Sequence, residues 1–279
     1  MQREEWIKFF RKKAWSFRKK IIQIIGNAGS GHPGGSLSVI DLLTVLYYYK
    51  LRYDPKNPDW EERDRVVLSK GHTCPALYVI LADLGVIPED WLWNLRKVDY
   101  PLQGHPARRT TPGIETSTGS LGQGFSVAVG MALGLKYIEK SEARVYAIIG
   151  DGEIQEGIVW EAAMFAGNKK LDNLIVILDN NTFQLDDRIY NINDPEPLKD
   201  KFEAFKWEVL EINGHDYAQI MDALDWAYSR RNGKPKLIKA RTIKGKGVSF
   251  MENNNKFHGK APTKEQVKQA LKEIEEIVK

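Results

Sequence analysis

The sequence predicts an α/β fold with a mostly parallel central sheet and helices on both faces. Residues 144–149 and 174–178 are continuous apolar runs, as expected for strands that are covered on both sides. Segments with helical patterning lie between such runs, and this alternation favours parallel strands joined by helical crossovers. The 279 residues suit one large domain or two small ones. Since no repeat or flexible linker interrupts the chain, we predict a single domain over residues 1–279.

The elements can be placed in order along the chain. Predicted helices cover residues 6–25, 37–49, 74–84, 122–138, 156–166, 217–228 and 263–278, so the first 60 residues form a largely helical region. Predicted strands cover residues 65–69, 144–149, 174–178, 207–212 and 237–243. Ser36 is the expected N-cap of the second helix. The basic residues of the first helix, Arg18 among them, are expected on its solvent-facing side rather than on a membrane surface.

Composition excludes several classes of protein. The formal charge of +4 is a mild excess, without the concentrated basic residues of nucleic-acid-binding proteins. No apolar run approaches the roughly 20 residues that span a bilayer, and the charged N-terminus lacks the apolar stretch of a signal peptide. The single cysteine, Cys74, cannot form an internal disulfide and is expected to be a small buried thiol. We therefore expect a soluble cytoplasmic protein without nucleic-acid or membrane partners.

Polar residues follow two neighbouring strands at the points where both strands end. Gly150-Asp151-Gly152 follows the first, and Asn181 lies thirty positions after Asp151, beyond the second. Carboxylate and amide oxygens suit Mg²⁺, with Ca²⁺ or Mn²⁺ also acceptable, and the Phe183 carbonyl is a further ligand candidate. The helix after Gly152, predicted from residue 156, would add the positive end of its dipole. Each motif alone is a common turn, but together they predict a metal–diphosphate site.

The histidines share an unusual context. Four of the five lie beside glycine in small-residue segments: His32, His72, His105 and His258. A lone histidine is more often structural than catalytic, yet glycine neighbours would let these four imidazoles approach a ligand. His215, in Asn-Gly-His-Asp, has the same context, so the pattern does not separate functional from structural histidines completely.

These motifs resemble those of known enzymes. The Gly-Asp-Gly motif followed by Asn181 is similar to the metal and diphosphate motif of thiamine diphosphate enzymes. Residues 30–35, 64–72, 104–106, 117–124 and 150–157 resemble transketolase closely, and the resemblance extends over essentially the whole chain. It implies the thiamine diphosphate-binding, or pyrophosphate-domain, fold.

The resemblance also implies roles for individual residues. His72, His258 and the Gly152 N–H would contact the cofactor diphosphate, and Asp151, Asn181 and the Phe183 carbonyl would bind the metal, with Asn181 also reaching the cofactor. His32, His105 and His258 would line the channel to the reactive carbon and move sugar hydroxyl protons, as suits imidazole near neutral pH. The rings would lie against Gly119 and Leu121, and the interface between paired domains would hold Glu156 and Glu161.

Transketolases carry two further domains that this sequence does not match. The resemblance therefore implies the N-terminal subunit of a split transketolase (EC 2.2.1.1, pentose phosphate pathway), in which a partner chain supplies the pyrimidine-binding and C-terminal domains in a dimer of heterodimers. The isolated chain is expected to bind the cofactor weakly. Alternatives are a subunit similar to deoxyxylulose-phosphate synthase or to the α chain of 2-oxoacid dehydrogenases, and a non-catalytic assembly subunit.

Overall fold

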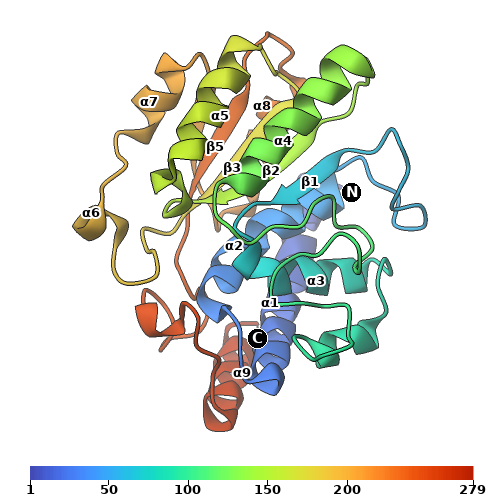
Figure 1. Ribbon diagram of the computed structural model, residues 1–279. Coiled ribbons are helices and arrows are strands. Elements are labelled where there is room, and N and C mark those ends of the chain that lie inside the picture. Colours follow the sequence, from blue (N-terminus) through green and yellow to red (C-terminus); the bar gives the residue numbers. More distant parts are fainter. Residues whose placement is uncertain (279) are drawn as a thin grey trace.

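The computed structural model describes residues 1–278, which contain a five-stranded, fully parallel sheet in the order β1-β2-β3-β5-β4 (Figure 1). The strands are β1 (Arg65–Leu68), β2 (Val145–Gly150), β3 (Leu174–Asn180), β4 (Glu208–Asn213) and β5 (Lys236–Arg241). The predicted α/β class is confirmed. β2 and β3 are buried along their whole lengths, which explains why their sequences are continuously apolar.

The sheet separates two hydrophobic cores. Alternate side chains of β2 point in opposite directions: Tyr146 and Ile148 enter one core, and Ala147 and Ile149 the other. The first core is covered by α1 (Arg3–Ala28), α2 (Pro33–Val45), α3 (Cys74–Asp83) and α8 (Tyr217–Ser229). The second is covered by α4 (Gln123–Leu133), α5 (Gly157–Asn168) and α7 (Leu198–Ala204), and α4 and α5 lie side by side (Figure 1).

The remaining elements are short or lie at the edges. α6 (Ile189–Ile192) follows β3, and α9 (Lys264–Val278) packs against α1 at the end of the described chain. π-helical segments extend α2 over Leu46–Lys50 and α4 over Gly134–Ile138. The sequence did not predict α6 and α7. These helices have 4 and 7 residues, which is too short for a helical periodicity to be recognised. No helix in residues 1–278 is long and apolar enough to cross a membrane.

One predicted helix start is wrong, and a second, predicted at residue 156, differs from the observed start by one residue. α2 begins at Pro33 rather than after Ser36, because proline at the first helical position has a suitable φ and no N–H that needs a partner. Ser36 lies inside the helix and donates its hydroxyl to the His32 carbonyl at 2.7 Å. The segment after Gly152 is a 3-10 turn over Glu153–Gln155, and α5 begins only at Gly157. No α-helix dipole therefore begins directly at Gly152.

Arg18 is also not solvent-facing as expected. Its guanidinium forms a buried, two-pronged ion pair with Asp41 of α2, at 2.8 and 2.6 Å. Asp41 further accepts hydrogen bonds from Tyr217 at 2.8 Å and contacts His215 Nδ1 at 2.7 Å. Burial opposes ionisation of Asp41, but Arg18 outweighs it and holds the pKa of this carboxyl far below its usual range. The network joins α1, α2 and α8.

Two residues left open by the sequence are structural. His215 uses both ring nitrogens, since Nε2 also accepts the Ile243 N–H at 2.9 Å, and it lies outside the group formed by the other four histidines. Cys74 is fully buried, and burial raises the pKa of its thiol to about 12. The expectation of a small buried thiol is confirmed.

Candidate active site

The two polar strand ends meet at the carboxyl edge of the sheet. β2 and β3 are neighbours, with Gly150 opposite Asp179, so Asp151 and Asn181 follow adjacent strands. A cavity of about 260 Å³ opens there. Its lining comes from sequence-distant segments: Gly35, Lys70, His72, Leu121, Gly150–Glu153, Gln155, Glu156, Asn181, Phe183–Leu185, Lys244 and His258.

Asp151 and Asn181 present oxygens within this cavity. Asp151 is 1% exposed, and its Oδ1 accepts the Gly152 N–H at 2.8 Å while Oδ2 accepts the Thr182 N–H. Burial raises the pKa of Asp151 to about 7, and Asp179 adds to the rise. Asn181 Oδ1 accepts the Phe183 N–H at 3.1 Å. Phe183, whose carbonyl is the third predicted metal ligand, therefore lies in the same loop as Asn181. A cation here would replace these contacts and favour the ionised carboxylate.

The metal candidates do not form an all-protein cage. Within residues 1–278, no group of three or more His, Cys, Asp or Glu side chains is placed to hold a metal ion. One carboxylate, one amide and one carbonyl would leave the remaining positions of an octahedral cation to phosphate and water oxygens. This incomplete set is what a metal bridging protein and diphosphate requires.

A buried ion pair lies directly below the cavity. Asp179 is fully buried at the end of β3 and accepts hydrogen bonds from Lys70 Nζ at 2.6 Å, from Ser38 and from Thr242. Lys70 is itself only 3% exposed and lines the cavity. The aspartate therefore holds a positive charge beneath the strand ends.

Glu153 fixes the loops around the cavity. Its carboxylate is almost fully buried and accepts the N–H groups of Gly122 at 2.8 Å and Gly150 at 3.0 Å, together with the Ser69 hydroxyl. It thus ties the start of α4, the end of β2 and the segment after β1 to one side chain. The Gly-Asp-Gly-Glu motif therefore carries a structural residue beside its candidate ligand.

The fold brings together the four histidines that share the glycine context. His32 lies 5.3 Å from His72, 6.1 Å from His105 and 5.7 Å from His258, measured between ring centroids. His72 and His258 stack at 5.3 Å. Burial, with help from neighbouring cations, lowers the pKa of His32 to about 4 and that of His258 to about 3, and lowers the pKa values of His72 and His105 as well. Near neutral pH the cluster consists of uncharged imidazoles that can accept protons.

Lys244 is a site residue that sequence reasoning missed. It is 1% exposed, and its Nζ lies 2.8 Å from His258 Nδ1, 3.0 Å from the Gln184 carbonyl and 3.2 Å from Asn255 Oδ1. Burial and the nearby Lys70 lower its pKa to about 7. Gly245 and Gly247, which follow Lys244 in the sequence, both have positive φ. These two closely spaced glycines are the only signal of a tight loop that the sequence offered.

Glycine at position 35 is required for close packing at the site. A Cβ there would lie 2.7 Å from Thr73 Cγ2 and 3.4 Å from His72 Nε2. The start of α2 can therefore approach the His72 segment only without a side chain. This explains why a glycine-rich stretch follows His32.

The other predicted residues lie around this cavity. Leu121 and Glu156 line it, and a Cβ at Gly119 would lie 3.7 Å from His105 Cδ2. Glu156 and Glu161 are exposed at the start and in the first turns of α5. The Gly152 N–H is engaged by Asp151, so it can donate to a diphosphate only by exchanging that contact.

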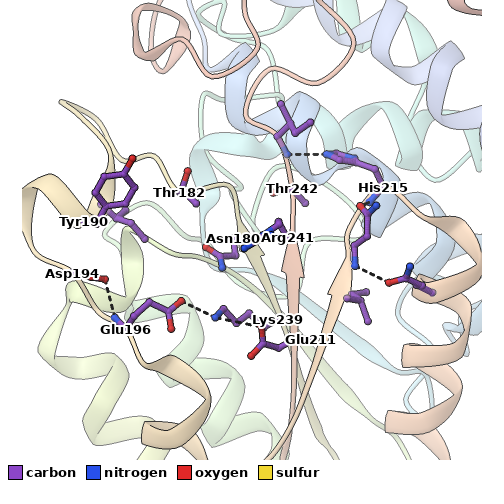
Figure 2. A pocket seen from close by; sticks show the side chains of 15 residues that line it. Asn180, Thr182, Tyr190, Asp194, Glu196, Glu211, His215, Lys239, Arg241 and Thr242 are labelled. Atoms are coloured by element: carbon purple, nitrogen blue, oxygen red, sulfur yellow. Dashed lines mark hydrogen bonds and ion pairs between the residues drawn. The ribbon is translucent and has the colours of Figure 1, made fainter.

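A larger cavity of about 690 Å³ lies at the ends of β3, β4 and β5 (Figure 2). Its charges are mostly neutralised internally, because Lys239 lies 2.7 Å from Glu196 and 3.7 Å from Glu211. The His215 ring that borders it is held on both nitrogens. Size alone therefore does not identify the active site, and the smaller cavity holds the chemistry.

The small cavity fits a diphosphate with a divalent cation. Lys70 and Lys244 bring positive charge to it, His72 and His258 add imidazole nitrogens, and Asp151 and Asn181 face the same space. His32 Nδ1 is buried without a hydrogen-bond partner in the described part of the chain, so this polar atom is free for a ligand. In parallel sheets of this kind, ligands bind in the crevice at the carboxyl ends of the strands, which is where these residues lie.

Comparison with known proteins identifies the family. The family model described as "Transketolase, thiamine diphosphate binding domain" matches residues 11–275, so the chain belongs to the transketolase family as its thiamine diphosphate-binding domain. The chain is 48% identical to the 6-deoxy-6-sulfo-D-fructose transketolase subunit of Clostridium sp. MSTE9, over 92% of this chain and 93% of that one. It is 43% identical to an apulose-4-phosphate transketolase subunit of Actinobacillus succinogenes, over 95% of each chain.

Solved transketolases share the fold. The Leishmania mexicana enzyme superposes with a TM-score of 0.91 at 32% identity, over 95% of this chain and 41% of that one. The Campylobacter jejuni enzyme gives a TM-score of 0.90 at 38% identity, over 96% of this chain and 43% of that one. The predicted thiamine diphosphate-binding fold and transketolase family are confirmed. The match gives no support to a subunit of the deoxyxylulose-phosphate synthase or 2-oxoacid dehydrogenase type.

Proposed function

We propose that this chain is the N-terminal subunit of a two-chain transketolase. It would bind the diphosphate and metal of thiamine diphosphate and take part in reversible transfer of a two-carbon ketol unit between sugar phosphates. The observation that carries the proposal is the convergence of Asp151, Asn181, Lys244 and the four clustered histidines on one strand edge. A cytoplasmic location and a role in pentose phosphate metabolism are part of the same proposal.

The diphosphate end of the cofactor would be held by hydrogen bonds and by the bound cation. Lys244, His72 and His258 line the cavity and offer donors to phosphate oxygens, while Asp151, Asn181 and the Phe183 carbonyl would hold Mg²⁺ or, in its place, Ca²⁺ or Mn²⁺. Leu121 would provide apolar contact for the rings, beside Gly119. When bound, thiamine diphosphate supplies the carbanion chemistry that amino-acid side chains lack.

Proton movement would fall to the imidazoles. His32, His105 and His258 have lowered pKa values, mainly because of burial, and are therefore neutral at the pH where sugar hydroxyls must be deprotonated and reprotonated. A neutral imidazole accepts a proton and returns it, which suits a reversible reaction. Lys244 keeps His258 Nδ1 hydrogen-bonded and so orients this ring.

A partner chain is part of the proposal. Relatives that align over more than nine-tenths of their own length are named as transketolase subunits, and full-length transketolases extend far beyond the aligned region. Large apolar side chains are exposed on the outer face of α4 and α5, namely Val127, Met164 and Phe165. This face also carries Glu161 and begins beside Glu156, so it is the surface proposed to meet the partner. A dimer of heterodimers, hence a heterotetramer, would result.

The donor sugar distinguishes versions of this function. The two relatives above are named for 6-deoxy-6-sulfo-D-fructose and apulose 4-phosphate, whereas other relatives are named simply as transketolase. Transketolase in the sense of EC 2.2.1.1 remains our proposal for this chain. The three donors differ in the part of the sugar beyond the transferred two-carbon unit, so they separate the candidate activities.

The test is reconstitution. The chain is produced alone and together with a chain that carries a pyrimidine-binding domain, and ketol transfer is measured from xylulose 5-phosphate, 6-deoxy-6-sulfofructose and apulose 4-phosphate. Transfer only in the mixture, dependent on thiamine diphosphate and a divalent metal, supports the proposal. Turnover by the isolated chain would contradict the need for a partner. A stable complex with cofactor bound but no transfer from any ketose would instead support an assembly role.

A further inference from the structure

Arg96 lies between two of the glycine–histidine segments. Its Nη2 would be 2.6 Å from a Cβ at Gly104, and its Nη1 would be 3.8 Å from a Cβ at Gly31. The guanidinium therefore lies flat against Gly104 and near Gly31, the residues that precede His105 and His32. A side chain at position 104 would occupy the space of the guanidinium, which explains the glycine there.

The backbone that presents Arg96 is in an unfavourable conformation. Its φ is 63°, in the left-handed region that residues with a Cβ rarely adopt. The Arg96 N–H donates to the Leu102 carbonyl at 2.8 Å and closes a tight loop. Tyr78 Oη bonds to the Gln103 carbonyl at 3.1 Å and the His105 carbonyl at 3.2 Å, which anchors the far end of that loop. Such strain persists only where the surroundings enforce it, and it is concentrated at functional sites.

The guanidinium is a free charge beside the imidazoles. In residues 1–278 we find no hydrogen bond or ion pair from the Arg96 side chain to a protein acceptor, although it is partly buried. After burial, its charge is the next largest cause of the lowered pKa values of His32 and His105. An arginine that served only to stabilise the loop would be expected to pair with a carboxylate or carbonyl.

Other titratable groups also face these two rings. His32 is flanked by His72, His105 and His258, and the charge of Lys244 also lowers its pKa. His105 faces His32 and Arg96. The charge of Arg96 lowers the pKa of both rings, whereas that of Lys244 lowers only the pKa of His32. Arg96 is therefore the cation that affects both imidazoles.

We propose that Arg96 is a positioning residue for ketol transfer, whose guanidinium packs between the Gly31–His32 and Gly104–His105 segments and places a fixed positive charge beside both imidazoles. The role in ketol transfer rests on the proposed function. The effect of Arg96 on the two imidazoles concerns this chain alone. Protonation of either ring would remove a proton acceptor from the channel. A permanent cation at this position adds to burial in opposing that protonation.

The first test measures the imidazoles directly. The full chain is titrated by NMR, with the His32 and His105 signals assigned by their loss in H32Q and H105Q. Arg96→Gln removes the charge at similar length, Arg96→Lys keeps it, and Arg109→Gln is the control, because Arg109 is exposed. We expect both imidazole midpoints to move to higher pH in R96Q, to move little in R96K and to stay unchanged in R109Q. Midpoints that are the same in R96Q and the native chain would overturn the proposal, provided that R96Q shows a native amide spectrum.

A second test uses the reconstituted enzyme. In R96Q the acid limb of the kcat/KM profile should move to higher pH, with the loss confined to pH values below about 6, because burial still holds the pKa of both imidazoles below the ordinary value of about 6.5. R96K should recover most of that loss. A uniform loss at every pH, not recovered by lysine, would overturn the electrostatic role. If no variant or native chain shows ketol transfer, the proposed function fails while the NMR result still decides the role of Arg96.

Discussion

Replacement of Lys244 by methionine should weaken cofactor binding more than any other single change at the diphosphate end. The side chain is 1% exposed and is held by three acceptors, His258 Nδ1, the Gln184 carbonyl and Asn255 Oδ1, at 2.8 to 3.2 Å. Lys244→Met removes the charge at nearly constant length. It also leaves these acceptors without their donor, and His258 loses its orientation.

The magnitude follows from the loss of one charge-assisted hydrogen bond. Such a bond to a charged group contributes about 1.5–3 kcal/mol. At about 1.4 kcal/mol per tenfold change in Kd, this predicts a dissociation constant for thiamine diphosphate that is roughly 10- to 150-fold higher. Binding of thiamine, which lacks the diphosphate, should change far less. This contrast separates the loss of charge from general damage to the site.

The assay is isothermal titration calorimetry in the presence of Mg²⁺, on the reconstituted complex and on the isolated chain. Lys264→Met is the matched control, because Lys264 is exposed at the start of α9 and does not line the cavity. Equal affinities of K244M and native protein for thiamine diphosphate would refute the reasoning. Equal weakening for thiamine and thiamine diphosphate would show that the lysine supports the cavity rather than the diphosphate.

Four further predictions concern metal binding, stability and assembly. Asp151→Asn should abolish the tightening of cofactor binding by Mg²⁺, measured as the ratio of Kd values with and without the metal. Arg18→Met leaves Asp41 buried without its cation and should lower the free energy of unfolding by about 3–5 kcal/mol in chemical denaturation. Because the pKa of Asp41 is depressed in the folded chain, its stabilising contribution is present above the unfolded pKa of about 3.9 and is lost progressively as the pH falls below it. Glu161→Arg should weaken association with the partner chain, measured by sedimentation, if α5 forms the interface.

The controls for these predictions come from exposed residues of the same type. Arg11→Met should leave stability within about 0.5 kcal/mol, since Arg11 lies on the exposed side of α1. Glu276→Arg on α9 should not affect assembly. If R18M were as stable as R11M, the buried ion pair would not hold α1 to α2. If D151N kept its full Mg²⁺ dependence, Asp151 would not be a metal ligand.

The candidate site could be predicted from sequence where its residues belong to local patterns. Asp151 and Asn181 were placed together because they follow consecutive buried strands, and neighbouring parallel strands end at the same edge. The glycine context identified His32, His72, His105 and His258. The same context also included His215, and only the fold shows that this ring is bound on both nitrogens.

Helix boundaries and individual charges were predicted less well. Ser36 is a good N-cap residue by type, but Pro33 begins α2 three positions earlier. Arg18 lies in a basic stretch that indicates a solvent-facing surface, yet it pairs with Asp41 of another helix. Local propensity cannot include a partner that is distant in sequence, and such a partner reverses the expected burial of a charge.

The sequence by itself determined the α/β class, the two strand ends that carry Asp151 and Asn181, and the glycine–histidine segments, because strand burial and backbone turns depend on neighbouring residues. Only the tertiary structure showed that Lys70, Lys244 and Arg96 belong with them. Lys70 is held by Asp179, Lys244 lies against His258, and Arg96 rests on Gly104. These residues acquire their roles from contacts across the fold, and the low polarity of a buried cavity makes each of those charges effective.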